Sequence, residues 1–166
     1  VFAFASRLVK GQYNLDLVKV TIPEGWSNRE IAKLLVTKLT KFVDTEFLTL
    51  AAPWEGYLFP DTYFFSPSAD ASQVIKTMRQ NFTNQTQPLM GEARRSARSW
   101  SQIIIMASLL EKEARLDETR RLISGILWKR LDDGMLLQVD AVFPYLIGKN
   151  SFTLTLKDLA LDSPYN

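Results

Sequence analysis

Apolar and polar residues alternate from Val18 to Ile22, which is the pattern of a β-strand with one buried face. A Pro–Gly turn follows this strand. Ser27 and Glu30 then have the spacing of a capping box at the start of a helix. Beyond the cap, apolar residues recur at the spacing of one buried helix face. They are Ile31, Leu34, Leu35 and Leu39.

The pattern weakens after a second short helix, predicted over residues 45–52 and ended by a proline. Residues 55–70 show no helical period and predict an irregular or hairpin segment that joins two parts of the chain. A third helix is expected to begin at Asp70. Its apolar face would contain Val74, Ile75, Met78 and Phe82. Residues 84–100 predict a polar connection.

Two longer helices are predicted in the second half. A central helix runs from Ser101 to about Arg115, and another runs from Asp117 to Asp132, with Gly134 placed to end it. The inner face of the second helix is expected to contain Leu122, Ile123, Ile126, Leu127 and Leu131. A turn then leads into a short helix.

These elements predict an α+β chain, with a small α/β subdomain in residues 1–53 and a mostly helical domain in residues 54–166. The 166 residues are 46% hydrophobic and 23% charged, as in globular proteins. A net charge of +2 without a basic run does not favour nucleic acid as a partner. No apolar run approaches the roughly 18 residues of a membrane span.

The chain has no cysteine and no histidine, which excludes thiol catalysis, cysteine zinc sites and serine–histidine triads. Acid–base chemistry therefore has to use Asp, Glu, Lys or Tyr side chains. There is no glycine-rich phosphate loop, and no carboxylate group has the spacing of a metal-binding loop. We expect neither a metal nor a cofactor.

Glu111 is the first candidate for chemistry, because it follows Ala107 and Ser108 by one turn on an apolar, small-residue face of the central helix. Desolvation on such a face favours the protonated carboxyl that a general acid needs at neutral pH. The alternative is that Glu111 and Glu113 begin a solvated helix end. Their partners would then be Lys112, Arg115 or Arg121.

Gln138 and Asp140 are two residues apart, so in an extended segment both point to one side. They form either a polar ledge for a substrate or ordinary turn chemistry, with Asp140 as the N-cap of the short helix.

The alternating polar residues near Trp54 are equally open to two interpretations. They form either a sugar-binding wall of aromatic faces and carboxylates or a packed junction. These residues are Glu55, Tyr57, Asp61 and Tyr63.

Several motifs, taken in order, resemble the endolytic murein transglycosylase family, also called YceG-like. They are EGYLFPDTY at residues 55–63, ASLLEKE at 107–113, RLDDGMLLQVD at 130–140 and DSPYN at 162–166. TIPEGWSNREIA, at residues 21–32, is similar to the LysM-like subdomain of that family. The chain differs from the family pattern at Ala141 and Val142, where a Pro–Thr pair is usual, and at Pro144.

The resemblance implies a single-pass protein of the inner membrane, anchored upstream of this sequence, whose outer part cleaves peptidoglycan glycan strands. It implies a lysozyme-like catalytic domain that continues beyond this sequence, lyase chemistry with 1,6-anhydro-muramic acid ends, and possible work beside the cell-wall synthesis machinery. It assigns the catalytic acid to Glu111. Gln138, Asp140, Tyr165 and Asn166 would then orient the sugar, with Glu113 as an ion-pairing neighbour.

Two other functions stay open. One is a glycoside hydrolase with Glu55, Asp61 or Asp140 as a second carboxylate. The other is a peptidoglycan-binding or scaffold module without turnover.

Overall fold

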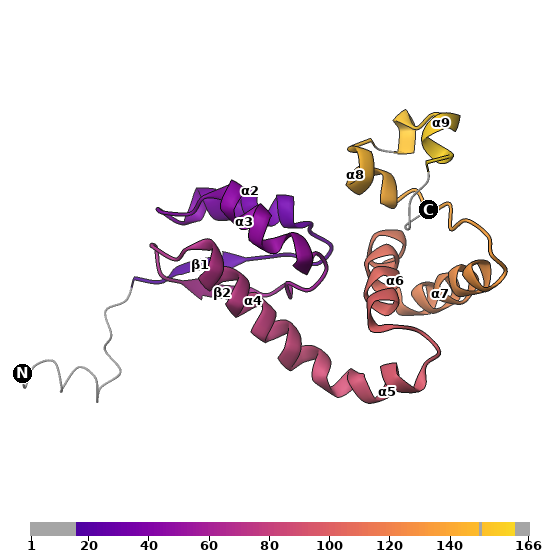
Figure 1. Ribbon diagram of the computed structural model, residues 1–166, viewed down its shortest axis with the longest axis horizontal. Helices are drawn as coiled ribbons and strands as arrows, with labels where there is room; N and C mark the ends of the chain where they lie inside the picture. The colour runs from indigo at the N-terminus through magenta and orange to yellow at the C-terminus, as the bar shows by residue number, and fades with distance from the viewer. Residues whose placement is uncertain (1–15, 150, 162–166) are drawn as a thin grey trace, which may run out of the picture. The chain divides into compact units, whose positions relative to one another are not determined.

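The computed structural model describes residues 16–149 and 151–161, and the chain divides into two compact units, one ending at Gln80 and one beginning at Asn81 (Figure 1). The first unit contains a two-stranded sheet and the helices that pack on it. Its elements are β1 (Val18–Thr21), α2 (Asn28–Lys38), α3 (Asp44–Ala51), η1 (Ala52–Trp54), β2 (Thr62–Phe65) and α4 (Ala71–Thr86).

The two strands pair antiparallel, with Val18 opposite Phe65 and Val20 opposite Tyr63. Alternate side chains of each strand point to opposite faces of the sheet. Val20, Tyr63 and Phe65 are buried, whereas Phe64 is exposed. The predicted strand is thus confirmed, and the segment after residue 55 contains its hairpin partner.

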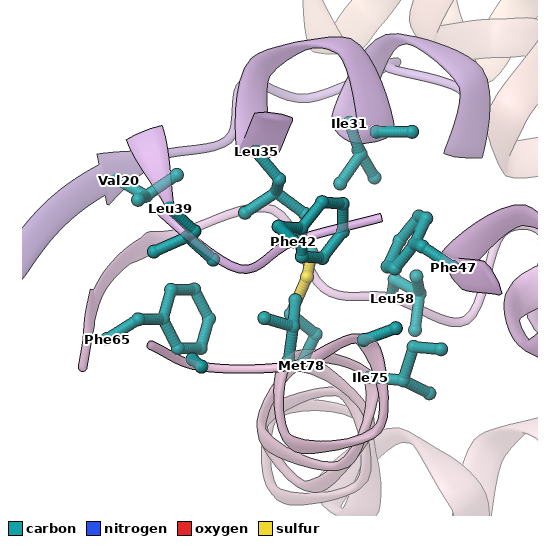
Figure 2. Packing of buried hydrophobic residues seen from close by; sticks show 14 of the residues in the cluster. Val20, Ile31, Leu35, Leu39, Phe42, Phe47, Leu58, Phe65, Ile75 and Met78 are labelled. Carbon is teal, nitrogen blue, oxygen red and sulfur yellow. The ribbon is translucent and has the colours of Figure 1, made fainter. Parts of the chain in front are cut away.

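The core of the first unit lies between the sheet, α2, α3 and α4. In Figure 2, Ile31 and Leu35 of α2 lie across the core from Met78 of α4. All three are at most 2% exposed. The predicted apolar faces of both helices are therefore confirmed, although Leu34 is only partly buried. Ser27 forms the predicted capping box of α2.

The boundary between the compact units lies between residues 80 and 81, whereas the predicted domains divide between residues 53 and 54. The reason is that β2 completes the sheet with β1, and α4 supplies one wall of the same core. Segment 54–80 consequently packs with the first unit. The functional division of the chain stays a prediction.

All secondary-structure elements described in the second unit are helices. This unit contains the end of α4 and a series of helices of different length. These are η2 (Gln87–Leu89), α5 (Met90–Arg95), α6 (Trp100–Glu113), α7 (Asp117–Asp132), α8 (Val142–Ile147), η3 (Ser151–Thr153) and α9 (Leu156–Leu159). The predicted polar connection therefore contains a helix, α5. The two predicted long helices are confirmed as α6 and α7.

A second core joins α6 and α7 to the segment that follows them. Its buried members are Met106, Leu109, Leu127, Leu137, Val139, Val142 and Phe143. On α7 the predicted inner face is only partly right. Leu127 is buried and Ile123 packs against the core, but Leu122, Ile126 and Leu131 are 68%, 52% and 40% exposed. One face of α7 packs on α6, and the residues of the adjacent face stay outside this core.

Two local features hold the C-terminal end of α7. Gly134 has a φ of 68°, and its N–H donates to the carbonyl oxygen of Leu131, a left-handed helix end that glycine adopts without strain. Arg98, just before α6, forms a 2.7 Å ion pair with Asp132, and its guanidinium lies 4.5 Å from the centre of the Trp128 ring. The loop before α6 is thereby joined to the last turns of α7.

The small antiparallel sheet and the many helices confirm an α+β class. Within the described part of the chain, no helix has the length and apolarity needed to cross a membrane.

Candidate active site on the second unit

Glu111 lies in the last turn of α6. This helix begins with a second capping box, formed by Ser99 and Gln102, and buries Met106 and Leu109 in the core. The opposite face carries Glu111, whose side chain is 36% exposed. Ala107 and Ser108, one turn earlier, are exposed too.

The prediction that Glu111 has apolar surroundings is therefore wrong for the part of the chain that the structure describes. Only one face of α6 is covered by α7 and the segment after it, and Glu111 is on another face. The small residues before it leave its carboxylate accessible from solvent.

Arg120 of α7 is the ion-pair partner of Glu111, with 3.0 Å between its Nη2 and Oε2 of the glutamate. The same guanidinium donates through Nε to the carbonyl oxygen of Ala114 at 2.8 Å, at the end of α6. Its Nη1 lies 3.8 Å from Oδ1 of Asp117. Arg120 thus joins the start of α7 to the end of α6 and holds one oxygen of Glu111.

The sequence pattern indicated Lys112, Arg115 or Arg121 as partners of Glu111 and missed Arg120. All four cations follow Glu111 within ten residues, and the sequence does not show which of them the turn between α6 and α7 brings back to it. In the described part of the chain, Oε1 of Glu111 has no hydrogen-bond partner. One carboxylate oxygen is therefore oriented by protein, and the other is available to a substrate.

Gln138 and Asp140 are both exposed, while Leu137 before them and Val139 between them are buried. This alternation agrees with the expectation that both polar side chains point to one side. Gln138 has a left-handed φ of 54°, which is uncommon for a residue other than glycine.

Arg130 of α7 holds this strained backbone. Its Nε and Nη2 donate to the carbonyl oxygen of Leu136 at 2.9 and 2.7 Å, and its Nη2 also donates to Oε1 of Gln138 at 2.8 Å. A left-handed residue of this kind costs on the order of 1–3 kcal/mol, and such residues occur often at functional sites. The sequence motif contained Arg130, but the periodic pattern did not indicate this contact.

Asp140 does not cap the short helix as the turn interpretation predicted. Helix α8 begins at Val142 after Ala141, no side chain caps it, and Phe143 donates instead to the backbone oxygen of Asp140 at 3.2 Å. Glu113 is exposed and forms no ion pair with any described residue. Tyr165 and Asn166 lie outside the described residues.

Glu55 and Tyr57 belong to the first unit. Oε1 of Glu55 accepts a hydrogen bond from the backbone N–H of Asn28, the first residue of α2, at 3.0 Å. Burial raises the pKa of Glu55, and this hydrogen bond opposes the rise. Glu55 thus joins the loop before β2 to the N-terminus of α2.

The predicted aromatic wall does not form as one surface. Tyr63 is buried, and its hydroxyl donates to the carbonyl oxygen of Phe59 at 2.6 Å. Tyr57 is half-buried, and its ring centre lies 5.7 Å from the guanidinium of Arg79. The tyrosines therefore have separate surroundings.

Comparison with known proteins gives the family. A profile of the YceG-like family matches residues 1–166, the whole sequence. The chain belongs to the YceG-like family. The motifs at residues 55–63, 107–113 and 130–140 lie within this match, so the resemblance inferred from them is confirmed.

Relatives of the YceG-like chain include the endolytic murein transglycosylase of Bacillus subtilis, 36% identical over 69% of this chain and 32% of the relative. The endolytic murein transglycosylase of Streptococcus pneumoniae is 32% identical over 68% of this chain and 21% of the relative. The matched stretch thus spans a third or less of these curated proteins.

A solved structure has a similar fold. The YceG-like protein of Listeria monocytogenes superposes with a TM-score of 0.78 at 26% identity. The match covers 99% of this chain and 63% of the Listeria chain.

Proposed function

We propose that the YceG-like chain is part of an endolytic peptidoglycan lytic transglycosylase. The enzyme cleaves the β-1,4 bond between N-acetylmuramic acid and N-acetylglucosamine in nascent glycan strands and leaves 1,6-anhydro ends, which limits strand length. The two named relatives support this activity. The observation that carries it in this chain is an accessible glutamate, Glu111, oriented through one oxygen by Arg120.

Glu111 acts first as an acid. Its protonated carboxyl donates to the glycosidic oxygen while the bond from that oxygen to C1 breaks. A bound glycan replaces the water around the glutamate, so the proton passes directly from the carboxyl to the glycosidic oxygen.

Glu111 then acts as a base. The carboxylate removes the proton from the 6-hydroxyl of the muramic acid, and that oxygen attacks C1 to close the anhydro ring. No water is consumed, and one carboxyl serves both steps, so a second catalytic carboxylate is not required. The N-acetyl group of the substrate stabilises the positive charge that develops at C1.

Gln138 and Asp140 orient the sugar in this proposal, because both are exposed on one side of a segment whose other side is buried. Tyr165, Asn166 and Glu113 provide further contacts in the second unit, and Glu55 and Tyr57 do so in the first. The whole protein is anchored in the cell membrane by a single span, faces the cell wall, and works beside the cell-wall synthesis machinery.

The test is Glu111→Gln in the full-length protein, with Glu113→Gln as a matched control on the same helix turn. The glutamine keeps the size of the side chain but removes the proton donor. We expect the release of anhydro-muropeptides, measured by mass spectrometry, to fall by about 10²-fold or more for Glu111→Gln and to fall much less for Glu113→Gln.

The products separate the rival functions. Equal release by Glu111→Gln and the unmodified protein would remove Glu111 from the mechanism. Reducing ends in place of anhydro ends would indicate a hydrolase. Binding to peptidoglycan without cleavage by either protein would indicate a binding module.

A further inference from the structure

The first unit contains a cavity of about 330 Å³ whose lining includes none of the residues assigned above. It lies between the end of α3, the short helix η1 and one face of α4. Its lining residues are Leu50, Trp54, Ser72, Ile75, Lys76 and Arg79, which we call the α4 groove. The last four recur at the spacing of a single helix face.

An arginine stacked on a tryptophan defines one end of the α4 groove. The Arg79 guanidinium lies 3.8 Å from the centre of the Trp54 ring and 5.7 Å from that of Tyr57. Stacking on aromatic faces holds a guanidinium in a fixed plane, while its N–H donors point outward in that plane. This geometry suits a planar anion such as a carboxylate.

The other residues that line the α4 groove favour an anion that also has an apolar part. Lys76 adds a second cation one turn before Arg79, and no acidic residue lines the groove. Leu50 and Trp54 are 43% and 36% exposed, so a ligand can reach their apolar surface. A neutral sugar is usually held by acceptors as well as donors, and the charged groups of this groove are all donors.

We propose that the α4 groove binds a carboxylate of peptidoglycan and so holds the glycan strand on the first unit. This inference rests on the proposed function for its substrate. Two parts of peptidoglycan supply the same chemistry: the lactyl group of muramic acid in strands without peptides, and the α-carboxylates of the stem peptide. Each of these two groups places a carboxylate next to methyl groups. This arrangement is complementary to the α4 groove, in which cations lie beside the apolar side chains of Leu50 and Trp54.

The experiment measures binding in the full-length Glu111→Gln protein by calorimetry, so that turnover does not enter. The probes are a peptide-free glycan strand, a free stem peptide and a neutral chito-oligosaccharide of equal length. We expect Arg79→Gln and Lys76→Gln each to weaken binding of at least one carboxylate probe about tenfold. Lys33→Gln, which removes an exposed lysine of α2 in the same unit, should change it less than twofold.

Two controls keep the result decisive. Thermal unfolding checks that each variant is folded. Arg79→Lys keeps the charge but loses the planar stack, so its affinity should lie between that of the protein with Arg79 and that of Arg79→Gln. The probe that loses affinity identifies the source of the carboxylate.

Unchanged binding of both carboxylate probes by Arg79→Gln and Lys76→Gln would overturn the proposal, as would an equal loss for the neutral oligosaccharide. Cleavage is measured separately. A result that refutes the lyase assignment can therefore be distinguished from a result that refutes carboxylate binding in the α4 groove.

Discussion

Arg120→Gln tests whether the ion pair on Glu111 positions the proposed acid. The substitution removes the charge and the two short guanidinium contacts, one to Oε2 of Glu111 at 3.0 Å and one to the carbonyl oxygen of Ala114 at 2.8 Å, together with the longer contact to Asp117 at 3.8 Å. Because the side chains of the pair are about one-third exposed, solvent screens the interaction, and it contributes about 0.2–1 kcal/mol. The bond to Ala114 adds about 0.5–1.5 kcal/mol.

The expected loss of unfolding free energy for Arg120→Gln is therefore about 0.7–2.5 kcal/mol, the sum of these two contributions. Activity should fall further than stability. If the freed carboxylate moves by about 1 Å, cleavage falls by about 10²-fold. The loss should be in kcat, because the substitution leaves the proposed sugar contacts of Gln138 and Asp140 in place.

The assay is release of anhydro-muropeptides by full-length protein, with urea unfolding of the same samples. Arg121→Gln is the matched control, since this neighbour is exposed and forms no ion pair with any described residue. Arg120→Lys keeps the charge, but an ammonium lacks the planar set of guanidinium N–H donors that reaches both Glu111 and the carbonyl oxygen of Ala114. The lysine variant should therefore have part of the cleavage rate that Arg120→Gln loses. A kcat for Arg120→Gln equal to that of Arg121→Gln would refute the positioning role.

Two further predictions concern the other predicted site residues. Burial raises the pKa of Glu55 above 4.5, so the unfolding free energy should fall as pH rises from 4.5 through the raised value. Glu55→Gln should remove this fall, which urea unfolding at several pH values measures. An unchanged slope of unfolding free energy against pH in the variant would contradict the prediction. Gln138→Gly should relieve the left-handed strain and keep or raise stability by up to about 1 kcal/mol, while anhydro product falls. Full activity in this variant would exclude Gln138 from sugar binding.

Local sequence was sufficient where a feature depends on neighbours along the chain. The capping box at Ser27 and the apolar faces of α2 and α4 appear as predicted, because helix periodicity and side-chain hydrogen bonds act within one or two turns. Gly134 was predicted for the same reason. The family was also readable, since its motifs lie in continuous stretches.

The site was only partly predictable. Glu111 was selected by the motif and its helix, and its catalytic role stays a prediction. Its surroundings were predicted wrongly, because an apolar stretch on α6 does not show which face a neighbour covers. Leu122 and Ile126 of α7 were misassigned for the same reason.

The sequence alone determined where the strand and most helices form, which faces of α2 and α4 enter the first core, and the family of the chain. The tertiary structure decided that β2 completes the first unit, that Arg120 holds Glu111, that Arg130 holds the strained Gln138, and that Arg79 stacks on Trp54. The physical reason is that periodicity and caps are local interactions. Pairing between strands and the choice among several arginines depend instead on how distant segments pack.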